Sequence, residues 1–188
     1  MQLHETESTS STTQDYVRWF RHSAPYINAH RNKTFVLMFG GEAVQHPNFQ
    51  HIIHDIALLH GARPQINQNL QEKQIQTPIH LHRRVTTRES LSCVMNAVGS
   101  IRLEIEALLS MGLANSPMFG ARIDAVSGNF VTAKPYGIRD GVDFQLTGEV
   151  RSIDTDAIQR HLDNHNIVVL GPTGYSTTGE VFNLLAEE

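Results

Sequence analysis

Two short apolar runs, each closed by glycine, constrain the fold of this chain most strongly. Residues 34–39 (TFVLMF) end at Gly40-Gly41, and residues 167–170 (IVVL) end at Gly171-Pro172. Runs of this length without polar alternation are typical of strands buried on both faces of a parallel sheet. Helical periodicity lies between them, so strand and helix alternate along the chain. We therefore expect an α/β fold with a mainly parallel sheet.

Apolar spacing predicts four helices around these strands. They cover residues 17–24, which end at Pro25, residues 49–59, a long stretch that begins at the capping box 86–89 (TTRE), and a stretch capped by Asp154 that turns Ile158 and Leu162 inward. Gly112 is a plausible stop for the long helix. Its expected apolar face consists of Leu91, Val94, Met95, Val98, Ile101, Ile105 and Leu108.

Turn signals organise the rest of the chain. Ser127-Gly128-Asn129 predicts a hairpin between residues 122–126 and 130–133, and residues 140–151 look like further short strands. Residues 182–188 resemble the first turn of a helix that the chain does not complete, so we expect a fragment. The Ser/Thr-rich residues 1–15 are expected to be a disordered tail, and residues 16–188 a single domain.

Composition excludes several function classes. The chain has 188 residues, 18% of them charged, and a formal net charge of −4, which gives no general attraction to nucleic acid or to an anionic membrane. Cys93 is the only cysteine, so no intramolecular disulfide can form; we expect a packed, inert thiol and a cytoplasmic protein. No leader or membrane-spanning run is expected.

Three strand-to-helix loops are candidate binding elements. They are residues 38–42 (MFGGE), 60–64 (HGARP) and 83–86 (RRVT). Glycines at a strand end let backbone N–H groups approach an anion, and Arg63 or the Arg83-Arg84 pair could hold a carboxylate. Taken singly, the Gly40-Gly41 pair is equally well explained as a tight turn, and an arginine in such a position is more often an ordinary surface charge. Together they predict a site for a small carboxylate or phosphate.

The eleven histidines do not predict a metal site. His51 and His54 are three residues apart on a predicted helix, and His80 and His82 share one face of a predicted extended segment. No HExxH motif, cysteine partner or third ligand accompanies them, so solvated or hydrogen-bonded histidines are expected. No G-x-S-x-G elbow supports a hydrolase, and no Walker or Rossmann motif is present.

Five ordered segments together resemble bacterial N-acetylglutamate synthase. They are residues 20–27 (FRHSAPYI), 39–43 (FGGEA), 61–66 (GARPQI), 126–130 (VSGNF) and 140–144 (DGVDF). The resemblance implies a three-layer αβα sandwich of the amino-acid-kinase type that binds L-arginine as feedback inhibitor. It also implies an acetyltransferase domain, absent from this chain, that uses acetyl-CoA as co-substrate and L-glutamate as acceptor. Homo-oligomeric rings are implied as well.

The same resemblance implies a kinase-like cleft that has lost its chemistry. Active kinase relatives carry a lysine two residues before the glycine pair, where this chain has Met38; Lys33 is about 16 Å away along a strand, too far to substitute. Their His-Gly-Gly-Gly loop is His60-Gly61-Ala62-Arg63 here. The cleft is expected to bind and regulate, with no catalytic residue or metal. Its predicted residues are Met38, Gly40, Gly41, Gly61, Arg63, Arg84, Asn183 and Glu187.

Two further expectations follow from the resemblance. His22 and Tyr26 fall in a segment that resembles the mobile helix of arginine-sensitive members, so they are assigned to the allosteric and assembly region, with packing between subunits as the alternative. Compared with the family, about ten residues, an inner strand and its turn, are expected to be absent next to Leu59-His60-Gly61, and the C-terminal part of the domain is expected to be absent as well. A gap in the sheet would leave the chain poorly stable.

Three alternatives stay open on the sequence. The protein could be a working acetylglutamate kinase, which Met38 argues against. It could be a stand-alone arginine-binding module without catalytic function. It could also be an inert truncated product.

Overall fold

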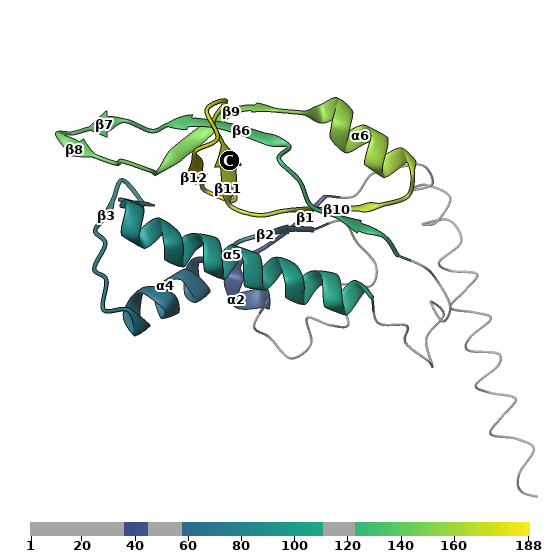
Figure 1. Cartoon of the computed structure of the whole chain (residues 1–188), viewed down its shortest axis with the longest axis horizontal. Helices are drawn as coiled ribbons and strands as arrows, with labels where there is room; N and C mark the ends of the chain where they lie inside the picture. Colours follow the sequence, from purple (N-terminus) through teal and green to yellow (C-terminus); the bar gives the residue numbers. More distant parts are fainter. Residues whose placement is uncertain (1–35, 45–57, 111–122) are drawn as a thin grey trace, which may run out of the picture. The chain divides into compact units, whose positions relative to one another are not determined.

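Four parallel strands form the sheet that organises the described residues, 36–44, 58–110 and 123–188, of this computed structural model. Their order is β1-β2-β10-β5, and every neighbouring pair is parallel (Figure 1). The predicted parallel α/β architecture and the strand at residues 167–170 are confirmed. The strands are β1 (Leu37–Phe39), β2 (Leu58–His60), β5 (Ala125–Val126) and β10 (Ile167–Leu170).

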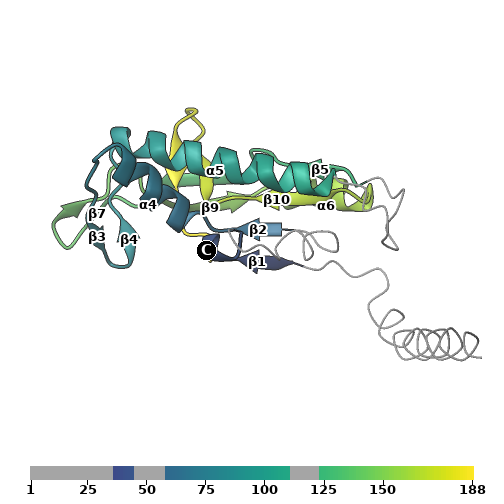
Figure 2. The ribbon, with the colours of Figure 1, turned by 90° about the horizontal axis from the view of Figure 1, so that it is seen from below.

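Helices cover both faces of this sheet (Figures 1 and 2). The alternation of side chains along β10 sends Val169 into the core formed with α4 and α5, and Val168 into the core formed with α6. The three-layer αβα sandwich that the resemblance implies is therefore present. The helices are α2 (Gly41–Val44), α4 (Arg63–Glu72), α5 (Arg88–Leu109) and α6 (Thr155–Asp163).

A second sheet, in the order β12-β11-β6-β9, continues from the ends of β5 and β10. Its core consists of Ala133, Phe182 and Leu184. Two hairpins, β3–β4 and β7–β8, complete the described strands. The bounds are β3 (Ile79–His80), β4 (Arg83–Arg84), β6 (Val131–Pro135), β7 (Ile138–Arg139), β8 (Val142–Asp143), β9 (Gly148–Ile153), β11 (Thr173–Tyr175) and β12 (Val181–Asn183).

The hairpin predicted around Ser127-Gly128-Asn129 is wrong. β5 pairs with β10 in the parallel sheet, whereas β6 pairs with β9 and β11 in the second sheet, so the segment carries the chain between sheets. A Cβ added at Gly128 would lie 2.9 Å from the Phe130 ring, so glycine is needed for close packing there.

The helical start predicted for residues 182–188 is also wrong. β12 pairs antiparallel with β11, and Phe182, Asn183 and Leu184 are all buried. Apolar residues two apart suit a strand with one face on a core, and here the second sheet supplies that core. Pairing with a distant strand overrides the local helical pattern.

The predicted gap in the parallel sheet is wrong as well. Leu58–His60 is not the end of a helix but strand β2, which lies between β1 and β10 and leads directly into Gly61. A three-residue strand fills the inner position, so the described strands leave no gap. β1 lies at the sheet edge, and Met38 is 51% exposed, so the expected burial on both faces does not hold for this strand.

The long helix begins one residue later than the capping box predicts. Thr87 is the N-cap, and its side chain accepts a hydrogen bond from the Ser90 N–H, while Thr86 is fully buried. Cys93 is fully buried, as expected, but Met95 is half-exposed. The predictions for residues 1–35, including His22 and Tyr26, and those at His51, His54 and Gly112 lie outside the described residues.

Replacing Asp154 with alanine is expected to cost about 1 kcal/mol of stability. The Asp154 carboxylate accepts a 2.9 Å hydrogen bond from the Ala157 N–H at the start of α6, which confirms the predicted cap. Urea unfolding measures the loss. The matched variant Asp154→Asn keeps an acceptor and should lose less; equal losses in the two variants would contradict a capping role.

Candidate functional site

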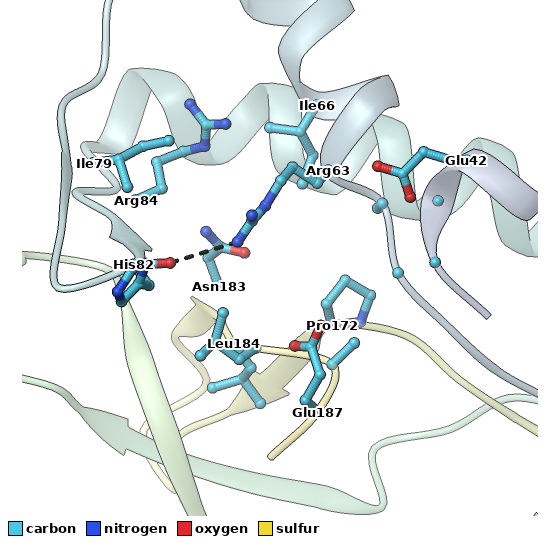
Figure 3. A pocket seen from close by; sticks show the side chains of 16 residues that line it. Glu42, Arg63, Ile66, Ile79, His82, Arg84, Pro172, Asn183, Leu184 and Glu187 are labelled. Carbon is cyan, nitrogen blue, oxygen red and sulfur yellow. Dashed lines mark hydrogen bonds between the residues drawn. The ribbon is translucent and has the colours of Figure 1, made fainter. Parts of the chain in front are cut away.

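A pocket of about 160 Å³ lies at the carboxyl ends of β1 and β2 (Figure 3). Seven of the eight predicted cleft residues line it; Met38 alone does not. Segments as distant in sequence as residues 40 and 187 thus meet at one edge of the sheet, where α/β folds place ligands. The lining residues are Gly40, Gly41, Glu42, Gly61, Ala62, Arg63, Ile66, Ile79, His82, Arg84, Pro172, Asn183, Leu184, Leu185, Ala186 and Glu187.

The floor of the pocket requires glycine at two positions. The Gly61 N–H donates a 2.7 Å hydrogen bond to the Phe39 carbonyl, which joins the loops after β1 and β2. A Cβ at Gly41 would lie 2.6 Å from Pro64 Cδ, and one at Gly61 would lie 3.2 Å from the Gly41 nitrogen. The glycines therefore serve close packing of the two loops against the start of α4.

Two arginines bring positive charge to the pocket. Arg63 is the first residue of α4 and donates a long, 3.5 Å hydrogen bond to the His82 carbonyl across the pocket. Arg84 is half-buried and donates to Thr77 Oγ1 at 2.5 Å and to Asn67 Oδ1. The pKa of the Arg84 guanidinium is lowered from its ordinary value, first by burial and then by the nearby charge of Arg63.

A buried polar network positions Asn183 and Arg84. Thr147 Oγ1 accepts a hydrogen bond from the Thr86 N–H at 3.0 Å and donates to the Arg84 carbonyl at 2.5 Å. Asn183 Nδ2 donates to Thr86 Oγ1 at 3.0 Å. Thr86 was expected in the third candidate loop and in the capping box, but not in a buried network. Nothing in the sequence around Thr147 distinguishes it from a surface threonine, so its part in this site was not predicted.

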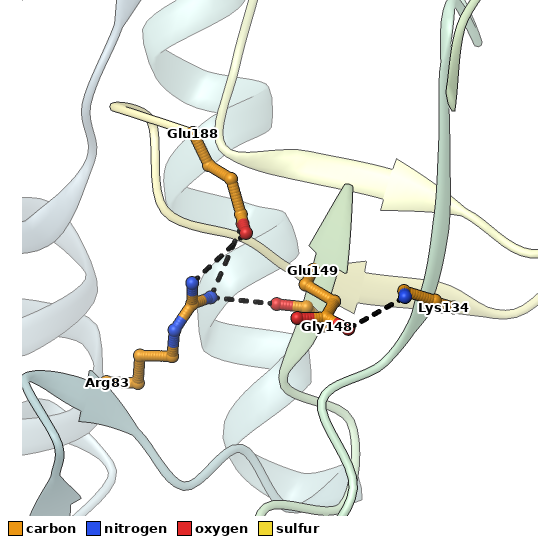
Figure 4. A network of polar contacts seen from close by, with 5 residues as sticks. All are labelled: Arg83, Lys134, Gly148, Glu149 and Glu188. Carbon is orange, nitrogen blue, oxygen red and sulfur yellow. Dashed lines mark hydrogen bonds and ion pairs between the residues drawn. The ribbon is translucent and has the colours of Figure 1, made fainter. Parts of the chain in front are cut away.

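Arg83 points away from the pocket, contrary to its expected role beside Arg84. Its guanidinium donates to the Gly148 carbonyl at 3.0 Å and pairs with Glu188 at 3.2 Å, while Lys134 and Glu149 form a separate pair at 3.0 Å (Figure 4). It also stacks on the Tyr136 ring, with its central carbon 4.5 Å from the ring centroid. Arg83 therefore anchors the β3–β4 hairpin to the second sheet.

Among the described residues, no lysine lines the pocket. The positive charge that phosphoryl transfer needs therefore does not come from a lysine there. The cationic side chains there are Arg63 and Arg84. Met38 and Phe39 are adjacent on β1, so their side chains face opposite sides of the sheet. Phe39 packs against the α4–α5 core, and Met38 projects from the other face.

His80 and His82 do not share the face of an extended segment. Leu81 and His82 have positive φ, 49° and 60°, and form the turn of the β3–β4 hairpin. His80 Nε2 lies 3.6 Å from Asp140 Oδ2, whereas His82 lines the pocket. In the described segments, no three His, Cys, Asp or Glu side chains are grouped to hold a metal ion. Within those segments, too, every helix is too short or too polar to cross a bilayer.

His60, at the end of β2, is 1% exposed and lines a second cavity of about 270 Å³ between α5 and the ends of the strands. Its pKa is lowered from the ordinary value by burial, an effect partly opposed by its hydrogen bond with the Gly61 carbonyl. His60 is therefore neutral in the folded chain at neutral pH.

Because the pKa of His60 is lowered in the folded chain, the free energy of unfolding is expected to fall as the pH drops below about 6.5, the ordinary histidine pKa. Between that value and the lower folded pKa the unfolded chain binds more protons, so unfolding becomes easier as pH decreases. Urea unfolding of wild type and His60→Gln from pH 7.5 to 5 should show a shallower decline in the variant. The exposed His165→Asn serves as control, and an unchanged pH slope in His60→Gln would contradict the assignment.

Comparison with known proteins places this geometry in a family. The model of the amino acid kinase family matches residues 33–187. An amino-acid acetyltransferase of Ectopseudomonas mendocina is 52% identical over 184 residues, and that of Azotobacter vinelandii is 52% identical over 185. Each alignment covers 93% of this chain but 43% of the relative, so the chain spans less than half the length of these proteins.

Solved structures agree with this result. N-acetylglutamate synthase from Neisseria gonorrhoeae, complexed with coenzyme A and N-acetyl-glutamate, superposes with a TM-score of 0.78 at 31% identity over 90% of this chain and 40% of that one. The same enzyme complexed with coenzyme A and L-arginine gives a TM-score of 0.80, covering 90% and 42%. With the sheet, the glycine loops and the family match taken together, the chain belongs to the amino acid kinase family.

Proposed function

We propose that this chain is the arginine-sensing regulatory portion of an N-acetylglutamate synthase. The observation that carries the proposal is the 52% identity to amino-acid acetyltransferases over 93% of the chain. The synthase from N. gonorrhoeae was also solved with L-arginine, and its structure matches this chain at a TM-score of 0.80. The whole enzyme would transfer an acetyl group from acetyl-CoA to the neutral amine of L-glutamate.

The pocket geometry supports a regulatory domain over a working kinase. Phosphoryl transfer depends on cations placed to stabilise the charge of the transferring group. Met38 offers no charge and lies outside the pocket, and Arg63 fills space where the family's kinase loop has glycine. The loops at residues 40–42 and 61–63 thus supply the frame of a kinase cleft without its lysine.

L-arginine would act by binding two arrangements of the enzyme with different affinity, which shifts their populations. His22 and Tyr26, in the N-terminal segment, are proposed to take part in that response and in assembly of a homo-oligomeric ring. The protein is proposed to work in the cytoplasm, with L-glutamate, acetyl-CoA and L-arginine as its small-molecule partners and with no nucleic-acid partner.

The test is an assay of the full-length protein that contains this segment. Acetyl transfer from acetyl-CoA to L-glutamate should be detected, and L-arginine should inhibit it. ATP-dependent phosphorylation of N-acetyl-L-glutamate should not be detected. Phosphorylation above background would favour the kinase alternative, and arginine binding without acetyl transfer would favour a stand-alone binding module.

A further inference from the structure

The second cavity, of about 270 Å³ between α5 and the ends of the strands, has no part in the proposed regulatory function. It shares no lining residue with the pocket at the ends of β1 and β2. Its apolar lining side chains are Met95, Val98, Val131, Val169, Leu170 and Val181. A cavity with this lining favours a ligand with an apolar body.

His60 brings an unused hydrogen-bond acceptor to this cavity. The side chain is 1% exposed and lines the cavity. Its Nδ1 lies 3.3 Å from the Gly61 carbonyl oxygen, which can only accept, so Nδ1 carries the proton of the neutral ring. Nε2 therefore has a lone pair, and no hydrogen bond among the described residues reaches it. A donor that enters the cavity would satisfy this buried acceptor.

Gly171 keeps the Nε2 atom of His60 open to the cavity. A Cβ added at Gly171 would lie 3.0 Å from His60 Nε2 and 3.0 Å from Val98 Cγ1. The φ angle of Gly171 is not positive, so its backbone conformation does not require glycine. A larger residue would fill the space between His60 and Val98, so glycine at this position preserves access to the acceptor.

Gly99 leaves a second opening, in the middle of α5. Glycine inside a helix is destabilising relative to alanine, so its presence in this 22-residue helix calls for a reason. A Cβ added at Gly99 would meet no atom within 4 Å, so packing among the described residues does not supply that reason. Gly99 lines the cavity, and its backbone is open to a molecule that occupies it.

The cavity has no free charge with which to hold an ion. Arg102 is the charged side chain that lines it in the described part of the chain, and its Nε lies 3.4 Å from Glu106 Oε1. The same Glu106 oxygen accepts a 3.4 Å hydrogen bond from Ser127 Oγ. An anion at Arg102 would have to compete with Glu106, so an uncharged ligand fits the cavity better.

The size of the cavity limits the ligand further. Its volume of about 270 Å³ exceeds the ~150 Å³ of an apolar cavity that holds one benzene molecule. It is slightly below the roughly 300 Å³ at which pockets for drug-sized ligands begin. One aromatic ring with a small substituent, or two fused rings, would therefore fit.

We propose that this cavity binds a small, uncharged aromatic compound that carries one O–H or N–H donor. The donor meets His60 Nε2 through the opening at Gly171, and the ring lies against the apolar wall beside the backbone of Gly99. Arg102 stays paired with Glu106 when the ligand is bound. The site goes beyond the proposed regulatory function and does not depend on it.

The first test compares phenol with toluene, which has a methyl group in place of the hydroxyl group. Each is titrated into the ¹⁵N-labelled 188-residue chain, and saturable shifts are expected at the amides of Gly99, Gly171 and Thr173. An apolar cavity without an acceptor would favour toluene, because phenol loses its hydrogen bonds to water. The acceptor on His60 should reverse this order, so that phenol binds about fivefold more tightly than toluene.

Three variants complete the experiment. Gly99→Leu should weaken phenol binding about tenfold or more, because the new side chain occupies the cavity. Ser100→Leu places the same side chain at the next, exposed position of α5, outside the cavity, and should leave binding unchanged. His60→Leu removes the acceptor and should restore the preference for toluene. If that buried substitution prevents folding, the ligand order in wild type and the loss in Gly99→Leu decide the question.

Saturable phenol binding that exceeds toluene binding and is lost in Gly99→Leu supports the proposal. It is overturned if phenol does not shift these amides in the folded wild type, if toluene binds at least as tightly, or if Gly99→Leu binds phenol normally. A Gly99 amide that shifts with protein concentration and not with phenol would mean that a second copy of the chain fills the opening, which also overturns it. Because neither acetyl transfer nor L-arginine enters the experiment, these failures do not bear on the regulatory function.

Discussion

Replacing Phe182 with alanine is expected to destabilise the folded chain by about 3–5 kcal/mol, the range for truncating a buried phenylalanine. Phe182 is 2% exposed and forms the core of the second sheet with Ala133 and Leu184. A Cβ added at Gly148 would lie 2.7 Å from Phe182 Cβ, so this side chain begins directly against the first residue of β9. Removing it leaves a cavity that the two strands cannot close by small shifts.

Urea unfolding measures this loss, and Leu103→Ala is the matched control, because Leu103 is 60% exposed on α5. The control should change the free energy of unfolding by less than about 0.5 kcal/mol. The Phe182 variant should also broaden the amide resonance of Asn183, since β12 carries that residue into the pocket. A loss below about 1 kcal/mol would mean that the C-terminal strand does not belong to the core.

Replacing Thr147 with valine is expected to cost about 1–3 kcal/mol, although the two side chains have nearly the same shape. The Thr147 hydroxyl accepts from the buried Thr86 N–H, which the change leaves without that partner. It also donates to the Arg84 carbonyl, which keeps a 3.3 Å hydrogen bond from Thr86 Oγ1. Each unsatisfied buried group costs about 1–3 kcal/mol. Thr147 is 2% exposed, so water cannot take over the lost bonds.

The control is Thr177→Val, the same change at an exposed position in the turn between β11 and β12. It should have little effect on unfolding by urea. The Thr147 variant should additionally weaken any ligand held at Arg84, because the hydroxyl fixes the backbone of that residue. If both threonine variants unfold at the same urea concentration, the network does not stabilise the pocket.

Local patterns were sufficient for elements that local chemistry determines. Asp154 caps α6 as expected. Its carboxylate accepts a hydrogen bond from an N–H only three residues later, so the interaction can be predicted from neighbouring residues alone. The glycine-closed run at residues 167–170 forms β10, which is one of the two inner strands of the parallel sheet. The long helix was also predicted, since its apolar spacing continues over six turns.

Local patterns failed where a distant partner decided the structure. Residues 182–188 have helical composition, yet β11 and the core around Ala133 make a strand of Val181–Asn183. Leu58–His60 continues the apolar spacing of a predicted helix, yet the inner position between β1 and β10 makes it a strand. A three-residue strand carries too little periodicity to be distinguished from a helix end.

The sequence alone determined the fold class and the glycine loops, because glycine and apolar runs act through chemistry that each residue carries with it. The seven predicted residues that line the pocket came from the family resemblance. Only the tertiary structure decided that Arg84 faces the pocket while Arg83 turns to Glu188, and that Thr86 and Thr147 support Asn183. Neighbouring residues on a strand point to opposite sides, and a buried hydroxyl acquires its partners only when segments 61 residues apart meet.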